Sequence, residues 1–136
     1  MIKLIVFDLD GVLVEARNFY YEAMNRALTS IDEKYVISKE EHFAKYDGLS
    51  TNKKLAILTK DKGLPPELHD DIWQEKQRCT HDIIIEEIRP YQHERIYYVL
   101  KKLKDEGYKV YCASNSIRSS VKLMLLKAGY MEYIDE

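Results

Sequence analysis

The N-terminal segment Ile2–Phe7 is a nearly continuous apolar run that stops abruptly at the acidic turn Asp8-Leu9-Asp10-Gly11. Such a run is typical of a strand that is buried on both faces of a parallel sheet, because a half-exposed strand alternates apolar and polar residues. In open α/β sheets, ligands bind beyond the carboxyl ends of the strands. The sequence therefore predicts a buried first strand that delivers acidic side chains to a ligand-binding edge.

Helical patterns fill residues 15–88. The apolar spacing predicts helices over Asn18–Leu28, Thr51–Lys60 and Glu67–Glu87, and Ser38-x-x-Glu41 is a capping-box signature that opens a further helix. Asp47-Gly48 interrupts that helix, and Gly63 with Pro65-Pro66 ends the next. We therefore expect an all-helical insert between the first strand and the rest of the chain.

The segment that follows Arg89-Pro90 combines two helices with one strand. The 3.6-residue spacing predicts an amphipathic helix before Gly107, β-prone residues predict a strand over Lys109–Ala113, and a second apolar stripe predicts a helix up to Gly129. The order of strand, helical insert, helix, strand and helix predicts an α/β fold. Residues 1–14 and 89–136 would form a parallel Rossmann-like core, and residues 15–88 a helical cap.

Composition limits the partners. The 136 residues carry 21 basic and 23 acidic side chains, a formal net charge of -2, and no long block of like charge, which disfavours a nucleic-acid partner. Membrane insertion and export are disfavoured because no apolar stretch approaches spanning length and the N-terminal run is too short for a signal peptide. Cys79 and Cys112 lack metal-site spacing, so we expect reduced thiols and a cytoplasmic protein.

The two acids at the end of the first strand suggest a shared cation. Asp8 and Asp10 are two residues apart, so an extended chain projects both carboxylates to the same side. Crowded carboxylates are costly unless a proton or cation lies between them, and their hard oxygen atoms favour Mg²⁺. Asp8 and Asp10 are therefore the predicted metal ligands.

Two segments resemble the motifs of a known superfamily. Phe7-Asp-Leu-Asp-Gly-Val-Leu13 resembles the first motif of the haloacid dehalogenase superfamily, and Cys112-Ala-Ser-Asn-Ser116 resembles its second. The helical insert has the length of the cap in the phosphoglycolate phosphatase and β-phosphoglucomutase-like subgroup. The resemblance implies that Asp8 is the nucleophile and a Mg²⁺ ligand, and that Asp10 is the general acid/base and binds the metal through its backbone carbonyl. It also implies that Ser114, with the backbone of Asn115, holds the phosphoryl group.

The implied activity is a Mg²⁺-dependent phosphatase acting on a small phosphorylated metabolite. Asp47–Lys54 resembles the cap loop that selects substrates in this superfamily, so Lys53 or Lys54 would contact an anionic group. Where related sugar-phosphate mutases carry an arginine and a histidine, this chain has Thr51 and Tyr20. That departure favours hydrolysis over mutase chemistry.

The resemblance also leaves expected parts missing. The superfamily completes its site with a lysine and a later acid beyond the second motif, whereas Asp135 and Glu136 match the segment before the next strand. We therefore expect an incomplete core: a truncated product, a chain whose missing strands come from another chain, or a noncatalytic remnant. Open sheet edges invite pairing, so self-association is a further expectation.

Other function classes remain in view. The alternative to an enzyme is a catalytically incomplete phosphate-binding or interaction protein. A phospho-acceptor receiver domain also uses acids and a hydroxyl, but the long helical insert argues against it. The four histidines have no shared ligand spacing, which predicts surface positions and not a metal cluster.

Overall fold

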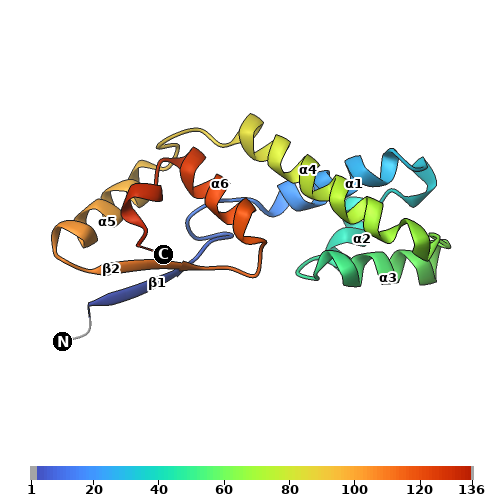
Figure 1. The fold of residues 1–136 in the computed structure, drawn as a ribbon, viewed down its shortest axis with the longest axis horizontal. Helices are drawn as coiled ribbons and strands as arrows, with labels where there is room; N and C mark the ends of the chain where they lie inside the picture. The colour runs from blue at the N-terminus through green and yellow to red at the C-terminus, as the bar shows by residue number, and fades with distance from the viewer. Residues whose placement is uncertain (1–2, 136) are drawn as a thin grey trace. The chain divides into compact units, whose positions relative to one another are not determined.

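The computed structural model describes residues 3–135, which fall into two compact units (Figure 1). One unit comprises Met1–Arg17 with Ile83–Glu136, here called the α/β unit, and the other comprises Asn18–Asp82, here called the helical unit. The sequence places the corresponding boundaries at 14/15 and 88/89. The predicted α/β class with an all-helical insert is the fold that the chain adopts.

The α/β unit is built on two parallel strands, β1 (Leu4–Asp8) and β2 (Lys109–Ala113). Figure 1 shows helices α5 (Glu94–Asp105) and α6 (Arg118–Ala128) on one side of this strand pair. A short 3-10 turn, η4 (Met131–Tyr133), follows α6. The order of helix, strand and helix after residue 90 is therefore the predicted one.

One face of the sheet is covered and the other is open. The register pairs Ile5 with Val110 and Val6 with Tyr111, and paired residues of a parallel sheet share a face. Val110 is completely buried, whereas Leu4 is 45% and Val6 54% exposed. The predicted burial of β1 on both faces is therefore wrong, because an apolar run does not reveal which of its faces a neighbouring element covers. The first residue of that predicted run, Ile2, lies outside the described residues.

The edge of β2 that faces away from β1 is contacted by Asp135. The Lys109 N–H donates to the Lys3 carbonyl (2.6 Å), so the backbone groups of Val110 point to the opposite edge. There the Asp135 N–H donates to the Val110 carbonyl, and the Val110 N–H donates to Asp135 Oδ2, each at 2.7 Å. Asp135 thus contacts this edge through one backbone and one side-chain hydrogen bond; the neighbouring Glu136 lies outside the described part of the chain.

The helical unit and its flanks contain a succession of helices and short turns. In chain order these are α1 (Arg17–Thr29), η1 (Glu33–Tyr35), α2 (Lys39–Glu41), η2 (His42–Tyr46), α3 (Thr51–Lys62), η3 (Pro66–Leu68) and α4 (His69–Glu87). One apolar core joins them, made of Met24, Ala27, Leu28, Tyr35, Ile37, Tyr46, Leu55, Leu58, Leu64 and Ile72. All of these core residues lie within Asn18–Asp82, so the helical unit has an apolar core of its own.

The helix ends follow local capping rules. The Ser38 hydroxyl accepts from the Glu41 N–H (3.1 Å), as the capping-box signature predicts, and the Ser50 hydroxyl accepts from the Lys53 N–H (3.3 Å) at the start of α3. The helix at Ser38 is short, because a π-helical turn begins at His42. His42 is only 3% exposed and packs against the Tyr21 ring. The predicted surface position is therefore wrong for this histidine.

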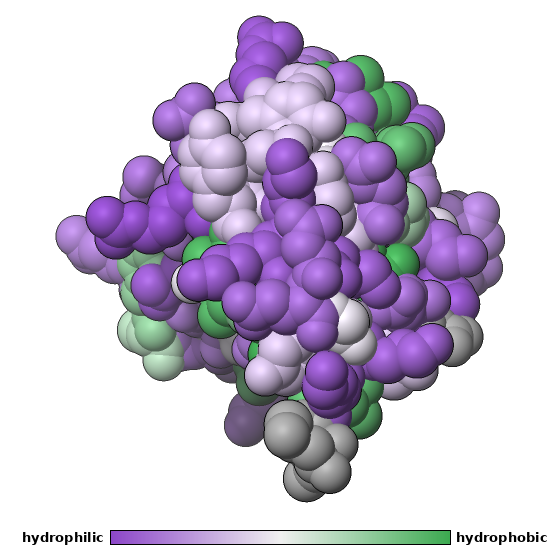
Figure 2. Space-filling view, turned by 90° about the vertical axis from the view of Figure 1, so that its left-hand side faces the viewer, coloured by the Kyte–Doolittle hydropathy of each residue, from purple (hydrophilic) through white to green (hydrophobic). Residues whose placement is uncertain are grey.

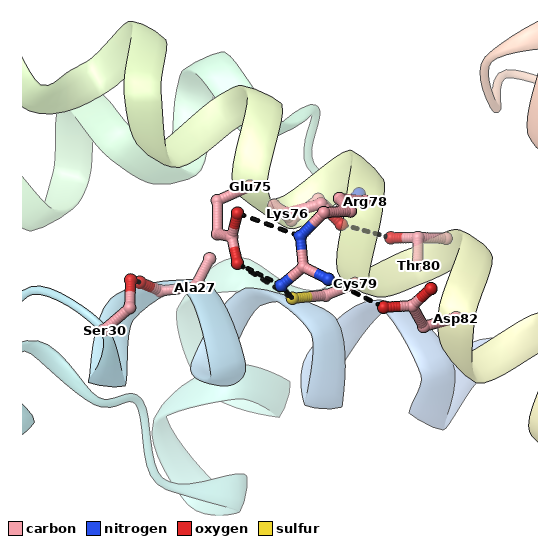
Figure 3. Close-up of polar contacts among 8 residues, drawn as sticks. All are labelled: Ala27, Ser30, Glu75, Lys76, Arg78, Cys79, Thr80 and Asp82. Carbon is pink, nitrogen blue, oxygen red and sulfur yellow. Dashed lines mark hydrogen bonds and ion pairs between the residues drawn. The ribbon is translucent and has the colours of Figure 1, made fainter.

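The outer side of α4 carries a charged network (Figure 3). The Arg78 guanidinium donates to the carboxylates of Glu75 and Asp82, which lie about one turn before and one turn after it on the same helix. Such exposed pairs contribute little to stability. Cys79 lies beside them but is buried, and burial together with the Glu75 charge raises the pKa of its thiol. Cys79 therefore stays protonated at neutral pH.

The face on which α5 lies is mainly hydrophilic, with only small apolar areas (Figure 2). The exposed side chains of α5 include Glu94, Arg95, Lys101 and Lys102. In the described part of the chain, no helix has both the length and the apolar character that crossing a membrane requires.

Candidate active site

The end of the sheet brings the predicted site residues of the α/β unit together. Asp8 is the last residue of β1 and pairs in register with Ala113, the last residue of β2. Ser114 and Asn115 follow Ala113 directly. The nucleophile expected at Asp8 and the hydroxyl expected at Ser114 are therefore carried to the same edge by neighbouring strands.

A hydrogen-bonded turn fixes Asp10 next to Asp8. The Leu9 carbonyl accepts from the N–H groups of Val12 (3.2 Å), Leu13 (2.9 Å) and Val14 (3.1 Å), and the Gly11 N–H donates to the Val14 carbonyl (2.9 Å). Gly11 has a φ of +75°, a backbone conformation that residues with a Cβ rarely adopt. Leu9 is completely buried. The turn is thus anchored by Leu9, and the acids on either side of it remain at the edge.

The two acids create a negative environment. The Asp8 side chain is exposed, and its Oδ1 accepts from the Leu9 N–H (2.7 Å); Asp10 is half-buried. Burial raises the pKa of the neighbouring Cys112 thiol, and the negative charges of Asp8 and Asp10 raise it further. The Cys112 thiol therefore interacts electrostatically with both carboxylates, and the raised pKa makes it unsuited to act as a thiolate. Such a site favours a bound cation.

The Ser114 loop leads into a helix. Ser114 is half-buried, and its hydroxyl accepts from the Ser116 N–H (3.1 Å), whereas Asn115 is exposed. Helix α6 begins at Arg118, and its N-cap residue Ile117 provides no side-chain cap. The amides at a helix start carry partial positive charge. The second motif thus combines a hydroxyl with backbone donors.

The donor set is compatible with a hard divalent ion. Asp8 and Asp10 provide oxygen donors only, which suits Mg²⁺, an ion that commonly keeps several waters and takes one or two protein carboxylates. Residues 3–135 contain no group of three or more histidine, cysteine, aspartate or glutamate side chains placed to hold a metal ion. Asp8 and Asp10 would therefore supply part of a coordination sphere, with water or substrate oxygens as the remainder.

The predicted cap residues belong to the helical unit and differ sharply in burial. Lys53 and Lys54 are both in the first turn of α3; Lys53 is exposed, whereas Lys54 is only 5% exposed. A second buried lysine, Lys76 of α4, is 7% exposed, and the sequence analysis missed it. Its signal is positional, since Lys76 lies four residues after buried Ile72 and three before buried Cys79, on the buried stripe of its helix.

A comparison with family models identifies one family. The family model for haloacid dehalogenase-like hydrolases matches residues 5–136. Members of this superfamily generally use a divalent metal ion. No curated protein matches the chain in sequence.

Solved structures share the fold at low sequence identity. CbbY from Rhodobacter sphaeroides, solved with xylulose-(1,5)bisphosphate, is 19% identical with a TM-score of 0.79, and the alignment covers 99% of this chain and 62% of that one. A family IA haloacid dehalogenase hydrolase from Entamoeba histolytica is 15% identical (TM-score 0.75, coverage 99% and 58%). A candidate β-phosphoglucomutase from Thermotoga maritima is 19% identical (TM-score 0.71, coverage 98% and 59%).

The chain therefore spans less than two thirds of the length of these structures, while nearly all of it aligns with them. Its fold is that of the β-phosphoglucomutase-like proteins, as the two motifs and the helical insert predict. The family model extends over almost the whole sequence, from β1 to the C-terminus. The chain belongs to the haloacid dehalogenase-like hydrolase family.

Proposed function

We propose that this protein is a Mg²⁺-dependent phosphatase that hydrolyses a small phosphate monoester through an aspartyl-phosphate on Asp8. The observation that carries the proposal is the register pairing of Asp8 with Ala113, because it sets the acidic turn beside the Ser114 loop at the edge where ligands of α/β sheets bind. Family membership supports the same chemistry.

In the first half-reaction, an Asp8 carboxylate oxygen attacks the phosphorus atom. The bond from phosphorus to the ester oxygen breaks, and Asp10, in its protonated form, donates a proton to the leaving alkoxide. The exposure of the Asp8 side chain at the strand end is compatible with this attack. Asp10 is left as a carboxylate.

In the second half-reaction, Asp10 accepts a proton from a water molecule that attacks the phosphorus of the aspartyl-phosphate. The bond between phosphorus and the Asp8 oxygen breaks, which releases inorganic phosphate and restores the free carboxylate. Asp10 therefore serves as acid and then as base, so the enzyme returns to its starting protonation state.

The surrounding groups would neutralise the phosphoryl oxygens. The Ser114 hydroxyl and the backbone amides around Asn115 would donate hydrogen bonds to these oxygens. A Mg²⁺ ion held by Asp8 and Asp10 would supply positive charge that offsets the negative charge developing on them. Lys53 and Lys54 are proposed to contact an anionic part of the substrate. The CbbY structure was solved with a bisphosphate, which supports a small phosphorylated metabolite as the substrate class. The free cysteines favour a cytoplasmic location.

The test is phosphate release from a panel of phosphate esters by the purified chain, with and without Mg²⁺. Asp8→Asn should reduce turnover by at least about a thousandfold, because the amide cannot form the acyl phosphate. Glu15→Gln, a change of an exposed acid in the same segment, should leave turnover unchanged. Activity that survives Asp8→Asn would exclude Asp8 as the nucleophile.

The same experiment separates the alternative. A phosphate-binding or interaction protein that does not turn over substrate would bind phosphate in a Ser114-dependent manner, with no phosphate released from any ester. Sustained Mg²⁺-dependent turnover by the 136-residue chain would exclude that alternative.

A further inference from the structure

Three junctions in the chain place an aspartate or asparagine directly before a glycine or serine: Asp10-Gly11, Asp47-Gly48 and Asn115-Ser116. At such junctions the backbone nitrogen of the second residue can attack the side-chain carbonyl carbon of the first, above all where a glycine has no Cβ to block the approach. We propose that Asp47-Gly48 is a site of aspartate isomerisation, a covalent modification that reroutes the main chain through the side-chain carboxyl of Asp47.

Asp47 and Gly48 are the two central residues of a tight turn. The Leu49 N–H donates to the Tyr46 carbonyl (3.1 Å) and closes this turn. Asp47 has a φ of −59° and a ψ of 134°, and Gly48 has a φ of +79°. These values match a type II turn, in which the amide between the central residues takes no part in the closing hydrogen bond. Both central residues are exposed, so the Gly48 nitrogen lies at the surface.

The three junctions differ in the hydrogen bonding of their backbone nitrogen. The Gly11 N–H donates to the Val14 carbonyl (2.9 Å). The Ser116 N–H donates to the Ser114 hydroxyl (3.1 Å). Within residues 3–135, the structure gives no hydrogen bond from the Gly48 N–H. A nitrogen that already donates must lose its hydrogen bond before it can attack, and the Gly48 nitrogen reacts without that cost.

The space around Gly48 permits the rotation that the reaction requires. The peptide plane between Asp47 and Gly48 has to turn until the nitrogen faces the side-chain carboxyl carbon. A Cβ placed on Gly48 would meet no atom within 4 Å, so this rotation is not blocked by a neighbouring group. The carboxyl group lies beside the same turn, since Oδ1 of Asp47 is 3.7 Å from Nε2 of His42.

The reaction consumes no co-reactant besides water. The Gly48 nitrogen forms a bond to the side-chain carboxyl carbon of Asp47, a C–O bond of the protonated carboxyl breaks, and its hydroxyl leaves with the amide proton as water. The product is a succinimide ring. A water molecule then attacks the backbone carbonyl carbon of Asp47, the bond from this carbon to the Gly48 nitrogen breaks, and the nitrogen regains a proton. The main chain now passes through the side-chain carbon, and the mass of the protein is unchanged.

Isomerisation lengthens the main chain by one carbon atom at the start of the Asp47–Lys54 segment. The longer chain no longer fits the turn that the hydrogen bond between Leu49 and Tyr46 closes. It also moves the carboxylate that lies beside His42. The modification requires neither catalysis at Asp8 nor a bound metal ion, so it is independent of the proposed phosphatase function.

The first measurement is peptide mapping of the full chain after prolonged warm incubation in water enriched with ¹⁸O. Hydrolysis of the succinimide incorporates one heavy oxygen atom, and fragmentation in the mass spectrometer distinguishes isoaspartate from aspartate. Each junction is measured in the folded chain and in guanidinium chloride, so that its own unfolded rate is the reference.

Folding should slow the reaction at Asp10 and Asn115 at least about tenfold, because their neighbouring nitrogens donate hydrogen bonds in the folded chain. Folding should change the rate at Asp47 by no more than about threefold. If Asp47 is slowed as strongly as Asp10, or stays unmodified in the folded chain, the proposal is overturned.

Two variants test the reacting atoms. Asp47→Glu keeps the charge but would have to form a larger ring, so modification at this position should fall to background. Gly48→Asn keeps a residue that tolerates left-handed backbone and adds a Cβ beside the nitrogen, which should slow isomerisation of Asp47 about tenfold. An unchanged rate in Gly48→Asn would contradict attack by this nitrogen.

A structural readout accompanies the chemical one. NMR of the chain labelled with ¹⁵N-histidine should show a second His42 signal that grows at the rate at which isoaspartate forms, because the carboxylate beside the ring has moved. The signal of His93, which belongs to the α/β unit, is the control and should stay single. Asp47→Glu should show no second His42 signal over the same time. A second signal that appears in this variant as well would assign the change to another process and contradict the proposal.

Discussion

Asp135 and Val110 exchange two hydrogen bonds: the Asp135 N–H donates to the Val110 carbonyl, and the Val110 N–H donates to the Asp135 carboxylate, each at 2.7 Å. The Lys104 ammonium donates to both carboxylate oxygens at 2.7 Å. These contacts hold the pKa of Asp135 below its usual value. The Asp135 carboxylate therefore links the edge of β2 with helix α5.

Replacing Asp135 should destabilise the α/β unit in a pH-dependent way. Because the folded-state pKa is lower than that of the unfolded chain, the stabilisation is present above the ordinary pKa and is lost as the pH falls through the folded value. Asp135→Asn should therefore unfold at a lower urea concentration than the parent at pH 7, and the gap should narrow only when the pH falls below the ordinary value of 3.8. Asp105→Asn changes an exposed aspartate of α5 and controls for net charge; an equal loss there would contradict the assignment.

Gly129 should not tolerate a side chain. Its φ is +82°, and an added Cβ would lie 2.8 Å from Cε1 of the Tyr91 ring. Gly129→Ala should cost more than the roughly 1–2 kcal/mol that left-handed backbone costs other residues. Gly63→Ala is the control, because Gly63 has a φ of +71° with open space around its Cβ position. If denaturant unfolding shows the same loss of unfolding free energy in both variants, the Tyr91 contact does not contribute to the cost of Gly129→Ala.

The two faces of the sheet should respond differently to substitution. Val110→Ala should destabilise the chain by about 2 kcal/mol, because Val110 is completely buried and the change leaves a cavity. Val6→Thr, on the open face, should change stability by no more than about 0.5 kcal/mol. Equilibrium urea unfolding of both variants measures this contrast, which disappears if the open face is covered in solution.

Neutralising Lys76 should stabilise the chain at neutral pH. The folded-state pKa of about 8 lies below the ordinary 10.5, so the unfolded chain binds more protons between these values, and the stability of the parent rises with pH across that window. Below pH 8 the buried charge of Lys76 lowers the free energy of unfolding by on the order of 3 kcal/mol. Lys76→Met should therefore be more stable than the parent at pH 7, and the difference should shrink towards pH 10.5.

Urea titrations of the parent and of Lys76→Met at pH 7 and pH 10 provide the measurement. Lys122→Met, which removes an exposed charge of α6, is the control for net charge. A Lys76→Met variant that is less stable than the parent at pH 7 would show that the ammonium has a partner of its own.

The sequence predicts the site edge well because simple rules determine it. Parallel strands end at the same edge, so Asp8 and the Ser114 loop had to lie close once both strands were identified. Caps also report helix starts locally, as the Ser38 hydroxyl does by accepting from the Glu41 N–H. The roles of Asp8, Asp10, Ser114 and Asn115 stay predictions, since position alone does not establish chemistry.

Burial was the harder property to predict, because it depends on elements that pack from elsewhere. Val6 is apolar but exposed, and His42 is polar but buried. Lys76 was overlooked because lysine is usually solvated, although it lies on the same stripe as Ile72. A charged residue at an apolar position of a helical stripe is the signal that would have found it.

The pairing of Leu4 with Lys109 joins residues that are 105 positions apart in the sequence, whereas the core of the helical unit is built entirely from the contiguous residues 18–82. Closing a long flexible loop costs entropy that grows with its length, and contacts of long range slow folding. The helical unit can form first and shorten the loop that remains to be closed. The edge that carries Asp8 and Ser114 should therefore be assembled late during folding, and any activity at that edge should be the last property that a refolding chain regains.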